Sequence, residues 1–355
     1  MNESPKERGA QMPKVSVIMP VYNVEQYVDQ AINSILNQSF KNFEFIIIND
    51  GSTDHSLERI KKYQDDSRIT VIDKENAGVS AARNDGIKMA KGIYLSFMDS
   101  DDEVEPNFLA KMVEHTKNIQ VDMLMCGYYV EHLDEKEGMT KQVPVRMRAG
   151  TFTKEHPPDW EVDANSLAML GYIWNKWYRR QVIIENHILF NEEMNFLEDI
   201  DFNAAAYKYA EDFLVLENCL YHYKRRRRTT LVSTFREEDF DMQLQSILKR
   251  KSILQEWGLE TPQLEQVVAY LHVHAVKGFC VNLFLNENQL TFTQKCEYLN
   301  KVIERPLTQE RVKLFIPQNI VDRILKLTIG KKMGYALAII STFYSTQRKV
   351  LKMKF

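Results

Sequence analysis

The segment Tyr94-Leu95-Ser96-Phe97-Met98-Asp99-Ser100-Asp101-Asp102 joins an apolar run directly to three carboxylates. The apolar part predicts a buried strand, and aspartate is poorly suited to a strand. In open α/β sheets, ligands bind beyond the carboxyl ends of the strands. Carboxylates two residues apart can share one hard cation, since Mg²⁺ and Mn²⁺ take oxygen ligands and often share them with substrate phosphates. Taken alone, the pattern also fits a strand end followed by a helix cap near Pro106.

The chain on the amino-terminal side of this segment alternates short apolar runs with helical patterns. Strands are predicted at 15–20, 43–48 and 69–72, and helices at 24–36, 55–63 and 78–90. The run at 43–48 is almost continuously apolar, which indicates a strand covered on both faces, as in a parallel sheet. Alternating strands and helices with short connections imply right-handed crossovers. We therefore expect half of a doubly wound α/β sheet in about the first 115 residues.

The pattern changes after Asn118. Strands are predicted at 121–130, 213–216 and 219–223, a short helix at 178–184, and a further helix that ends near Ala210. Residues 131–158 are polar and contain Gly and Pro, which predicts an irregular connection. From Phe235 onward, apolar residues recur at helical spacing, so this part is expected to form a helical appendage.

Composition narrows the class of protein. Of 355 residues, 44% are hydrophobic and 27% are charged, which is ordinary for a globular protein. A net charge of −3 argues against nucleic-acid binding driven by bulk charge. The four cysteines are widely spaced, which predicts buried thiols in a reducing compartment. We find no apolar signal segment near the start, and no run that reaches the ~20 apolar residues of a spanning helix.

Four polar motifs follow the predicted strand ends in order. They are Pro-x-Tyr-Asn at 20–23, Asp-Gly-Ser-Thr-Asp at 50–54, Gly-x-Ser-x-Ala-Arg-Asn at 78–84 and Asp-x-Asp at 99–101. Each motif is a weak signal alone, but unrelated α/β proteins have no reason to repeat all four. Together they resemble the inverting family 2 glycosyltransferases of the GT-A fold, such as those of bacterial capsule, exopolysaccharide and teichoic-acid synthesis. The resemblance implies a Rossmann-like α/β domain with a mostly parallel central sheet.

The resemblance and the helical pattern together predict the domain organisation. Residues 1–13 are expected to be a flexible segment. The catalytic domain is predicted at 14–234, with a nucleotide-binding half at 14–118 and an acceptor half at 119–234. The helical region at 235–355 ends in a basic tail at 323–355.

The resemblance also assigns a nucleotide-sugar site. Its positions map onto Pro20, Tyr22, Asn23, Asp50, Gly51, Ser52, Arg83, Asp99, Ser100 and Arg226. Within it, Asp50 is implied to bond the uracil-like edge, Gly51 to allow close backbone approach, and Arg83 to face the nucleotide or diphosphate. Asp101 is implied to hold Mn²⁺ or Mg²⁺, which neutralises the charge of the leaving nucleoside diphosphate. Each residue alone also fits a turn, a cap or a surface position.

The catalytic base is predicted at Glu198-Asp199. The family supplies its base from an acidic pair at this point, and we favour Asp199, with Glu198 supporting it or binding the acceptor. A carboxylate half-buried under aromatics can have its pKa raised toward a useful value. The pair also fits an ordinary acidic helix start. Other acids nearby, among them Glu192 and Glu193, leave the register open.

Two further segments resemble the family. Residues 174–179 match its Trp-Asn-Lys-x-Tyr-Arg pattern. Trp174 therefore either forms the base of the acceptor site or lies in the core. Residues 221–230 match its Tyr-x-Tyr-x-x-Arg pattern but contain four consecutive arginines. Of these, Arg226 is the one that we expect to meet the diphosphate.

The tail at 323–355 carries eight Lys or Arg and no acidic residue, and 333–347 is uncharged and largely apolar. This pattern fits an interfacial helix on an anionic leaflet, and equally a terminal helix docked on the core. Dimerisation is a further role open to the helical region.

These observations lead to one preferred function. We expect a metal-dependent enzyme that moves a hexose or N-acetylhexosamine from a UDP-sugar to a hydroxyl of a cell-surface glycan or its lipid-linked precursor. It would act in the cytoplasm, peripherally at the inner face of the cell membrane. The alternatives are a polyprenyl-phosphate glycosyltransferase and a non-catalytic glycan-binding or scaffold protein on the same fold.

Overall fold

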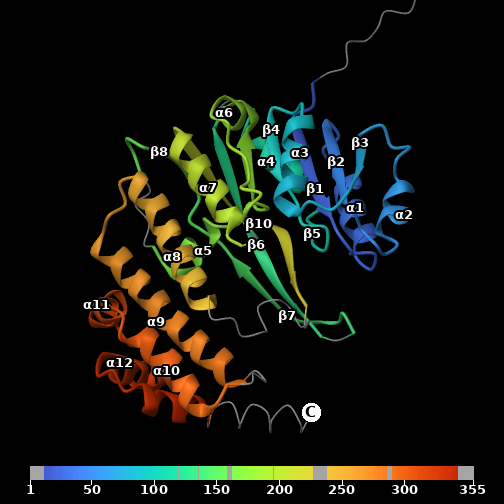
Figure 1. Ribbon diagram of the computed structural model, residues 1–355. Coiled ribbons are helices and arrows are strands. Elements are labelled where there is room, and N and C mark those ends of the chain that lie inside the picture. Colours follow the sequence, from blue (N-terminus) through green and yellow to red (C-terminus); the bar gives the residue numbers. More distant parts are fainter. Residues whose placement is uncertain are drawn as a thin grey trace, which may run out of the picture. The chain divides into compact units, whose positions relative to one another are not determined.

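The computed structural model describes residues 12–117, 120–134, 136–157, 162–194, 196–226, 238–285 and 290–342. These residues belong to two compact units (Figure 1). The first unit comprises the chain up to His156 together with Tyr172–Arg226. The second comprises Pro157–Gly171 and the chain from Arg227 onward. The predicted flexible segment at 1–13 lies almost entirely outside the described residues.

The first unit is organised around one sheet, which has ten strands among the described residues. The strands are β1 (Val15–Val21), β2 (Phe43–Asp50), β3 (Ile69–Lys74), β4 (Tyr94–Phe97), β5 (Glu103–Val104), β6 (Met123–Leu133), β7 (Met139–Val145), β8 (Gly150–Thr153), β9 (Lys176–Arg179) and β10 (Asp212–Arg225). Their order is β3-β2-β1-β4-β9-β6-β10-β5, with β7 paired to β6 and β8 to β10. β1 is parallel to β2 and β4, β2 to β3, and β6 to β10, whereas β9 is antiparallel to both of its neighbours. The predicted mostly parallel sheet is confirmed.

Helices connect and cover these strands (Figure 1). They are α1 (Val28–Leu36), α2 (Ser56–Lys61), α3 (Val79–Met89), α4 (Phe108–Glu114), α6 (Arg180–Glu185) and α7 (Glu198–Tyr209). α1 shows why the sequence forms them, because Val28, Ala31, Ile32 and Ile35 recur at helical spacing and are all buried. α3 approaches the sheet closely, since a Cβ atom at Gly86 would collide with Ile18. β1 pairs in parallel with both β2 and β4, so the carboxyl ends of these three strands lie beside each other.

The prediction of an irregular connection at 131–158 is wrong in part. β6 continues to Leu133, β7 pairs antiparallel with it, and β8 pairs antiparallel with β10. The physical reason is the position of β7 at the margin of the sheet, where most of its side chains are exposed. A strand with little burial carries no apolar alternation, so the sequence pattern that reveals strands is missing.

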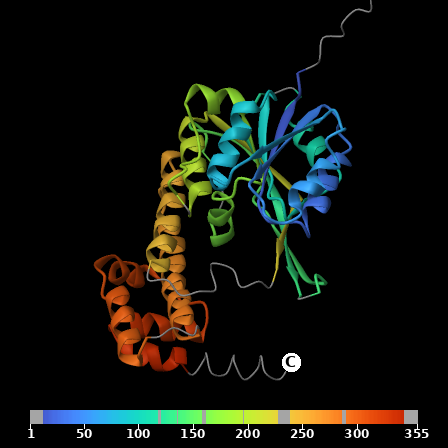
Figure 2. The same cartoon turned by 45° about the vertical axis from the view of Figure 1, so that its right-hand side comes forward.

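The second unit is helical among its described residues. Its elements are α5 (Ala164–Met169), α8 (Asp239–Glu256), α9 (Pro262–Leu285), α10 (Phe292–Ile303), α11 (Pro306–Leu314) and α12 (Ile320–Gly330). The long helices α8 and α9 lie side by side in both views (Figures 1 and 2). α5 packs on this pair, and α10, α11 and α12 pack on α9. The helical appendage predicted from Phe235 onward is present, and the structure groups Pro157–Gly171 with it.

The prediction that no segment is long and apolar enough to span a membrane is wrong by the measures of length and composition. Within the described residues, one helix, Pro262–Phe284, meets this test by length and composition. Half of its most apolar window is buried inside the structure. This helix is the centre of the second unit, and its fully buried His272 Nε2 lies 2.9 Å from Thr308 Oγ1 of α11. Packing on all these neighbours accounts for its apolar composition.

Candidate active site

A single arginine brings three of the predicted site residues together. Arg83 lies on α3 and is only 4% exposed. Its Nη1 donates to Asp199 Oδ1 at 2.7 Å and to Glu198 Oε1 at 3.3 Å, and its Nη2 donates to Asp99 Oδ1 at 3.3 Å. The Asp-x-Asp segment and the acidic pair, about one hundred residues apart in sequence, therefore meet at one guanidinium. Arg83 was predicted to face the nucleotide or diphosphate, and in this structure its terminal nitrogens bind these carboxylates.

Local contacts explain why the acidic pair lies at this place. Asn84, the neighbour of Arg83, accepts a bond from the Phe190 backbone N–H at 2.8 Å and donates to the Phe190 carbonyl at 2.9 Å. The Phe190 ring stacks on Phe202 of α7 with centroids 4.2 Å apart. Leu197, immediately before α7, has a φ of 67°, which is unusual for a leucine. The chain is thus turned sharply so that Glu198 and Asp199 begin the helix facing Arg83.

The electrostatics of this cluster suit Asp199 to proton transfer. Burial raises the pKa of Asp199 to about 7, the Arg83 charge opposes this rise, and the charges of Glu198 and Asp99 add to it. Burial likewise raises the pKa of Asp99, against the opposing effect of Arg83. A general base is most effective when its pKa lies near the working pH. Asp199 therefore has the affinity for protons that a base at neutral pH requires.

The loop after β4 is held by a residue whose role was not predicted. Asp102 is 2% exposed, accepts a bond from the Tyr221 hydroxyl at 3.0 Å, and accepts another from the Lys224 backbone N–H at 2.8 Å. The Asp99 backbone N–H donates to the same Tyr221 oxygen at 3.2 Å. Burial and the neighbouring charges of Asp101 and Asp99 raise the pKa of Asp102. Asp102 thus joins the Asp-x-Asp loop to β10.

Asp101 and Arg226 are in direct contact. Arg226 Nη1 lies 3.2 Å from Asp101 Oδ2 and 2.7 Å from the Asp101 carbonyl oxygen. Its Nε donates to Glu137 at 3.0 Å, and its guanidinium carbon lies 3.9 Å from the centre of the Tyr27 ring. The structure therefore brings the predicted diphosphate-binding arginine to the predicted metal-binding carboxylate. The following arginines, at 227 and 228, lie outside the described residues.

The loops that follow β1 and β2 are joined to each other by hydrogen bonds. Asn23, with a φ of 52°, accepts a bond from the Thr53 backbone N–H at 2.8 Å, and its own N–H donates to Ser52 Oγ at 3.1 Å. The two Asp50 carboxylate oxygens accept bonds from the N–H groups of Ala77 and Gly78, each at 2.9 Å. Asp50 therefore also orders the loop that precedes α3. Gly51 has a φ of 69°, and a Cβ there would lie 2.6 Å from the Asn76 nitrogen, so glycine is required.

An open hollow adjoins the loop that follows β2. Gly51, Ser52, Asn49 and Asn76 are among the residues that line it, at the carboxyl ends of β2 and β3. Its volume is about 510 Å³, which lies within the usual range for small-molecule sites. Tyr22 is 50% exposed, whereas Pro20 is buried in β1. The structure thus offers room beside Gly51 and Ser52.

The residues present fit a hard divalent cation. Asp99 and Asp101 follow β4, and their side chains are 32% and 40% exposed. Their carboxylate oxygens are therefore accessible to a cation from solvent. A cationic group, the Arg226 guanidinium, already lies against Asp101. Among the described residues, no group of three His, Cys, Asp or Glu side chains is arranged to hold a metal by itself. Mg²⁺ is typically held by one or two carboxylates plus substrate phosphates, and this arrangement matches that mode.

Trp174 lies inside an aromatic stack. It is 2% exposed, and its ring stacks on Tyr172, Tyr221 and Tyr223 with centroid distances of 4.7, 4.4 and 5.7 Å. Tyr221 connects this stack to Asp99 and Asp102. Tyr172 and Tyr223 are only partly buried, so they present the accessible surface of the stack. The assignment of Trp174 to acceptor binding stays a prediction.

Comparisons with known proteins agree with this architecture. The family model described as "Glycosyl transferase family 2" matches residues 16–180. EpsJ of Bacillus subtilis strain 168, described as an uncharacterized glycosyltransferase, is 32% identical over 280 residues, which is 78% of this chain and 80% of the relative. EpsH of the same strain is 32% identical over 303 residues, which is 84% of this chain and 85% of the relative. The chain therefore belongs to glycosyltransferase family 2 and is a glycosyltransferase.

A solved structure supports the same fold. The structure of S. aureus TarS residues 1–349 in complex with UDP-GlcNAc has a TM-score of 0.62 to this chain, with 22% sequence identity. The similarity covers 96% of this chain and 92% of that one. The predicted family and the predicted GT-A fold with carboxy-terminal helices are thus confirmed.

Proposed function

We propose that this glycosyltransferase moves a hexose or N-acetylhexosamine from a UDP-sugar to a hydroxyl of a cell-surface glycan or its lipid-linked precursor, with inversion at the anomeric carbon. The observation that carries the proposal is the meeting of Asp99, Glu198 and Asp199 at Arg83. A carboxylate with a pKa of about 7 is thereby placed beside the Asp-x-Asp loop. TarS shares the fold, so uridine nucleotides are the first donors to test.

In the proposed reaction, Asp199 takes the proton of the acceptor hydroxyl. The acceptor oxygen forms its bond to the anomeric carbon while the bond from that carbon to the UDP oxygen breaks. Inversion requires the base and the leaving group on opposite faces of the sugar, as in inverting glycosidases. Arg83 keeps part of the Asp199 population ionised near pH 7, because its positive charge opposes the effect of burial.

The leaving diphosphate is assigned to Asp101 and Arg226. Mn²⁺ or Mg²⁺ bound at Asp101 would neutralise charge on the diphosphate oxygens. Arg226 is held by Asp101, Glu137 and the Tyr27 ring in this structure. A diphosphate that binds Arg226 would compete with Asp101 for this guanidinium.

We also propose that the second unit contacts an anionic membrane. Ile320, Ile324 and Leu327 recur at helical spacing along α12 and are 72%, 38% and 52% exposed. The segment that follows exposes Tyr335 and Ile339 at 56% and 62%. Arg323, Lys331 and Lys332 are exposed beside these apolar side chains. An apolar stripe with a basic border is typical of interfacial helices, which supports a peripheral place at the inner face of the cell membrane. The part of the tail from 343 onward lies outside the described residues.

Calorimetric titration of UDP, with and without Mn²⁺, tests the donor and metal assignments. The wild type should bind UDP more tightly with Mn²⁺, and Asp101→Ala should lose this difference. Glu192→Gln is a matched control, because Glu192 is an exposed acid that bonds Asn84 and not Arg226. A wild type that binds UDP equally well with and without Mn²⁺ would refute the metal assignment, and no binding in either condition would refute the donor.

A further inference from the structure

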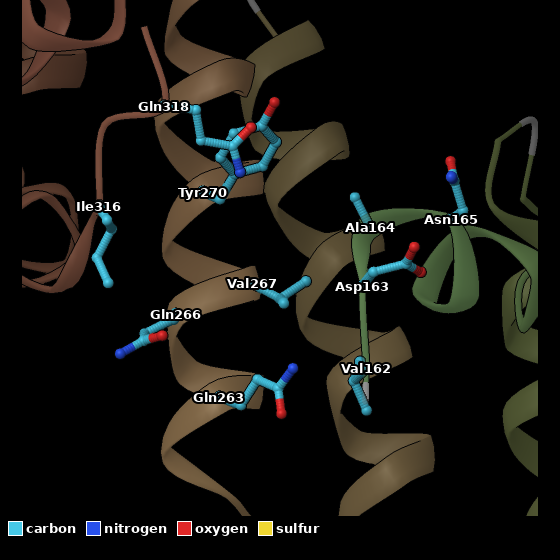
Figure 3. Close-up of a pocket in the computed structure, with 10 residues that line it drawn as sticks. All are labelled: Val162, Asp163, Ala164, Asn165, Gln263, Gln266, Val267, Tyr270, Ile316 and Gln318. Atoms are coloured by element: carbon cyan, nitrogen blue, oxygen red, sulfur yellow. The ribbon is translucent and has the colours of Figure 1, made fainter. Parts of the chain in front are cut away.

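The helical unit contains a cavity that belongs to none of the predicted sites. Its volume is about 530 Å³, which is within the usual range for ligand sites. Figure 3 shows its lining residues, which come from three segments: α9, the start of α5, and the connection between α11 and α12. All three segments are parts of the second unit. The cavity is therefore a feature of this unit alone.

One face of α9 forms the central part of the lining. Gln263, Gln266, Val267 and Tyr270 are spaced three, four and seven residues from the first, which places them along one side of the helix. Both glutamines are exposed, whereas Val267 and Tyr270 are partly buried. The Tyr270 ring is held by stacking on His274, with centroids 4.2 Å apart, and by a tilted contact with Phe315. This face thus presents two amides about one and two helical turns from a fixed aromatic ring.

The segments on either side are fixed by hydrogen bonds. Asp163 caps α5, because its Oδ1 accepts bonds from the Ser166 backbone N–H and hydroxyl, both at 2.6 Å. The backbone N–H of Gln318 donates to Asp322 Oδ2 at 3.0 Å, and Asp322 is fully buried. Lys326 Nζ donates to the Phe315 carbonyl at 2.6 Å. The start of α5 and the connection between α11 and α12 are therefore held in place before any ligand arrives, which reduces the entropy lost on binding.

The chemistry of the lining favours a neutral ligand rich in hydroxyl groups. Four primary amides line it, from Asn165, Gln263, Gln266 and Gln318. Each amide offers a carbonyl acceptor and two N–H donors, which matches a hydroxyl that both donates and accepts. The lining residues include one acid, Asp163, and no Lys or Arg. A polyanion such as a phosphate polymer would find no cationic partner here, and Asp163 would repel it.

We infer that this cavity binds a neutral oligosaccharide segment of the acceptor glycan, through residues other than those assigned to transfer. The inference rests on the proposed function only in taking the acceptor to be a glycan. Such a site raises the local concentration of the acceptor chain end, because a chain bound at one point searches a smaller volume. Binding by a few amides and one ring on an open surface is expected to be weak, in the range of about 0.1–1 mM.

The test uses the full chain and two neutral probes, the β-1,4-linked hexamers of glucose and of N-acetylglucosamine. Binding is measured by saturation-transfer NMR and by titration calorimetry. The wild type should bind at least one hexamer, and the double variant Gln263→Ala/Gln266→Ala should bind it at least tenfold more weakly. Gln245→Ala is the matched control, because Gln245 is an exposed glutamine on α8 outside the lining, and it should bind as the wild type does. An anionic hexamer of galacturonic acid should not bind.

The outcomes separate this inference from the proposed function. Asp101→Ala should bind the hexamer normally even where it loses Mn²⁺-dependent UDP binding. If the wild type binds neither neutral hexamer, or if the double variant binds as well as the wild type, the inference is wrong whatever the result with UDP. If the hexamer binds through these glutamines and UDP does not bind at all, the proposed donor fails and this site stands. Both glutamines are exposed, so unfolding of the variants is not expected, and their melting temperatures should match that of Gln245→Ala.

Discussion

Replacing Glu198 by glutamine should move the pH dependence of activity in a known direction. Asp199 must be ionised to accept a proton, so kcat/KM should rise with pH through the Asp199 pKa of about 7. The Glu198 charge contributes to that raised pKa because it repels a second negative charge. Glu198→Gln removes the repulsion while keeping the size of the side chain. The pKa of Asp199 should fall, and the rising limb should move to lower pH.

The size of this change follows from the geometry around Arg83. Glu198 Oε1 and Asp199 Oδ1 lie 3.3 and 2.7 Å from the same Arg83 nitrogen, so these two oxygens are at most about 6 Å apart. Two unit charges at 6 Å interact by ~3 kcal/mol at an effective dielectric constant of ~20, which corresponds to about 2 pH units. Partial exposure of both carboxylates weakens the repulsion. We therefore expect a displacement of about one pH unit.

The assay is the initial rate of UDP release from UDP-N-acetylglucosamine or UDP-glucose between pH 5 and 9. Glu192→Gln is the matched control, because Glu192 lies in the same acidic segment but bonds Asn84 rather than Arg83. Its midpoint should stay at that of the wild type. A Glu198→Gln midpoint that is unchanged, or displaced to higher pH, would refute the electrostatic reasoning. A large displacement in Glu192→Gln would show that the register of the base is wrong.

Three further predictions concern stability and binding. Asp199→Asn should increase the free energy of unfolding at pH 8, because the folded-state pKa of about 7 lies above the ordinary value of 3.8. The increase should nearly vanish below about pH 3, where the carboxyl group is protonated in both states; urea unfolding at pH 8 and pH 3 checks this, and an equal gain at both pH values would contradict it. Gly51→Ala should destabilise the protein by at least ~1–2 kcal/mol, because its φ is 69° and the added methyl meets Asn76; unaltered urea unfolding would count against this account of the loop. Ile324→Asp/Leu327→Asp should reduce binding to vesicles of phosphatidylglycerol in sedimentation, and unchanged binding would exclude α12 as the contact.

Much of the site was predictable because its parts follow strand ends. Parallel strands gather their carboxyl ends at one edge, so motifs after β1, β2 and β4 had to lie near each other. The acidic pair was placed by family resemblance rather than by any local rule. That this pair binds Arg83 could not be predicted. The pairing of Arg83 with Asp199 spans 116 residues and depends on how Asn84 holds Phe190.

The features that sequence did not reveal share a physical cause. The contacts of Asp102 could not be predicted, because its partners Tyr221 and the Lys224 backbone come from β10, far along the chain. β7 lacks the apolar alternation of a strand because it is largely exposed. The length and apolar composition of α9 were not recognised, and they reflect its packing against several neighbouring helices. In each case, tertiary contacts decide what local pattern cannot.

The most direct test of the central claim is the turnover of a UDP-sugar by Asp199→Asn, with UDP affinity measured on the same preparation. Asparagine keeps the shape of the side chain but cannot take a proton at neutral pH. Turnover should fall at least about a hundredfold, in line with the usual contribution of a general base, while the dissociation constant of UDP should change by less than about threefold. Turnover near that of the wild type, with UDP still bound, would contradict the assignment of Asp199 as the base.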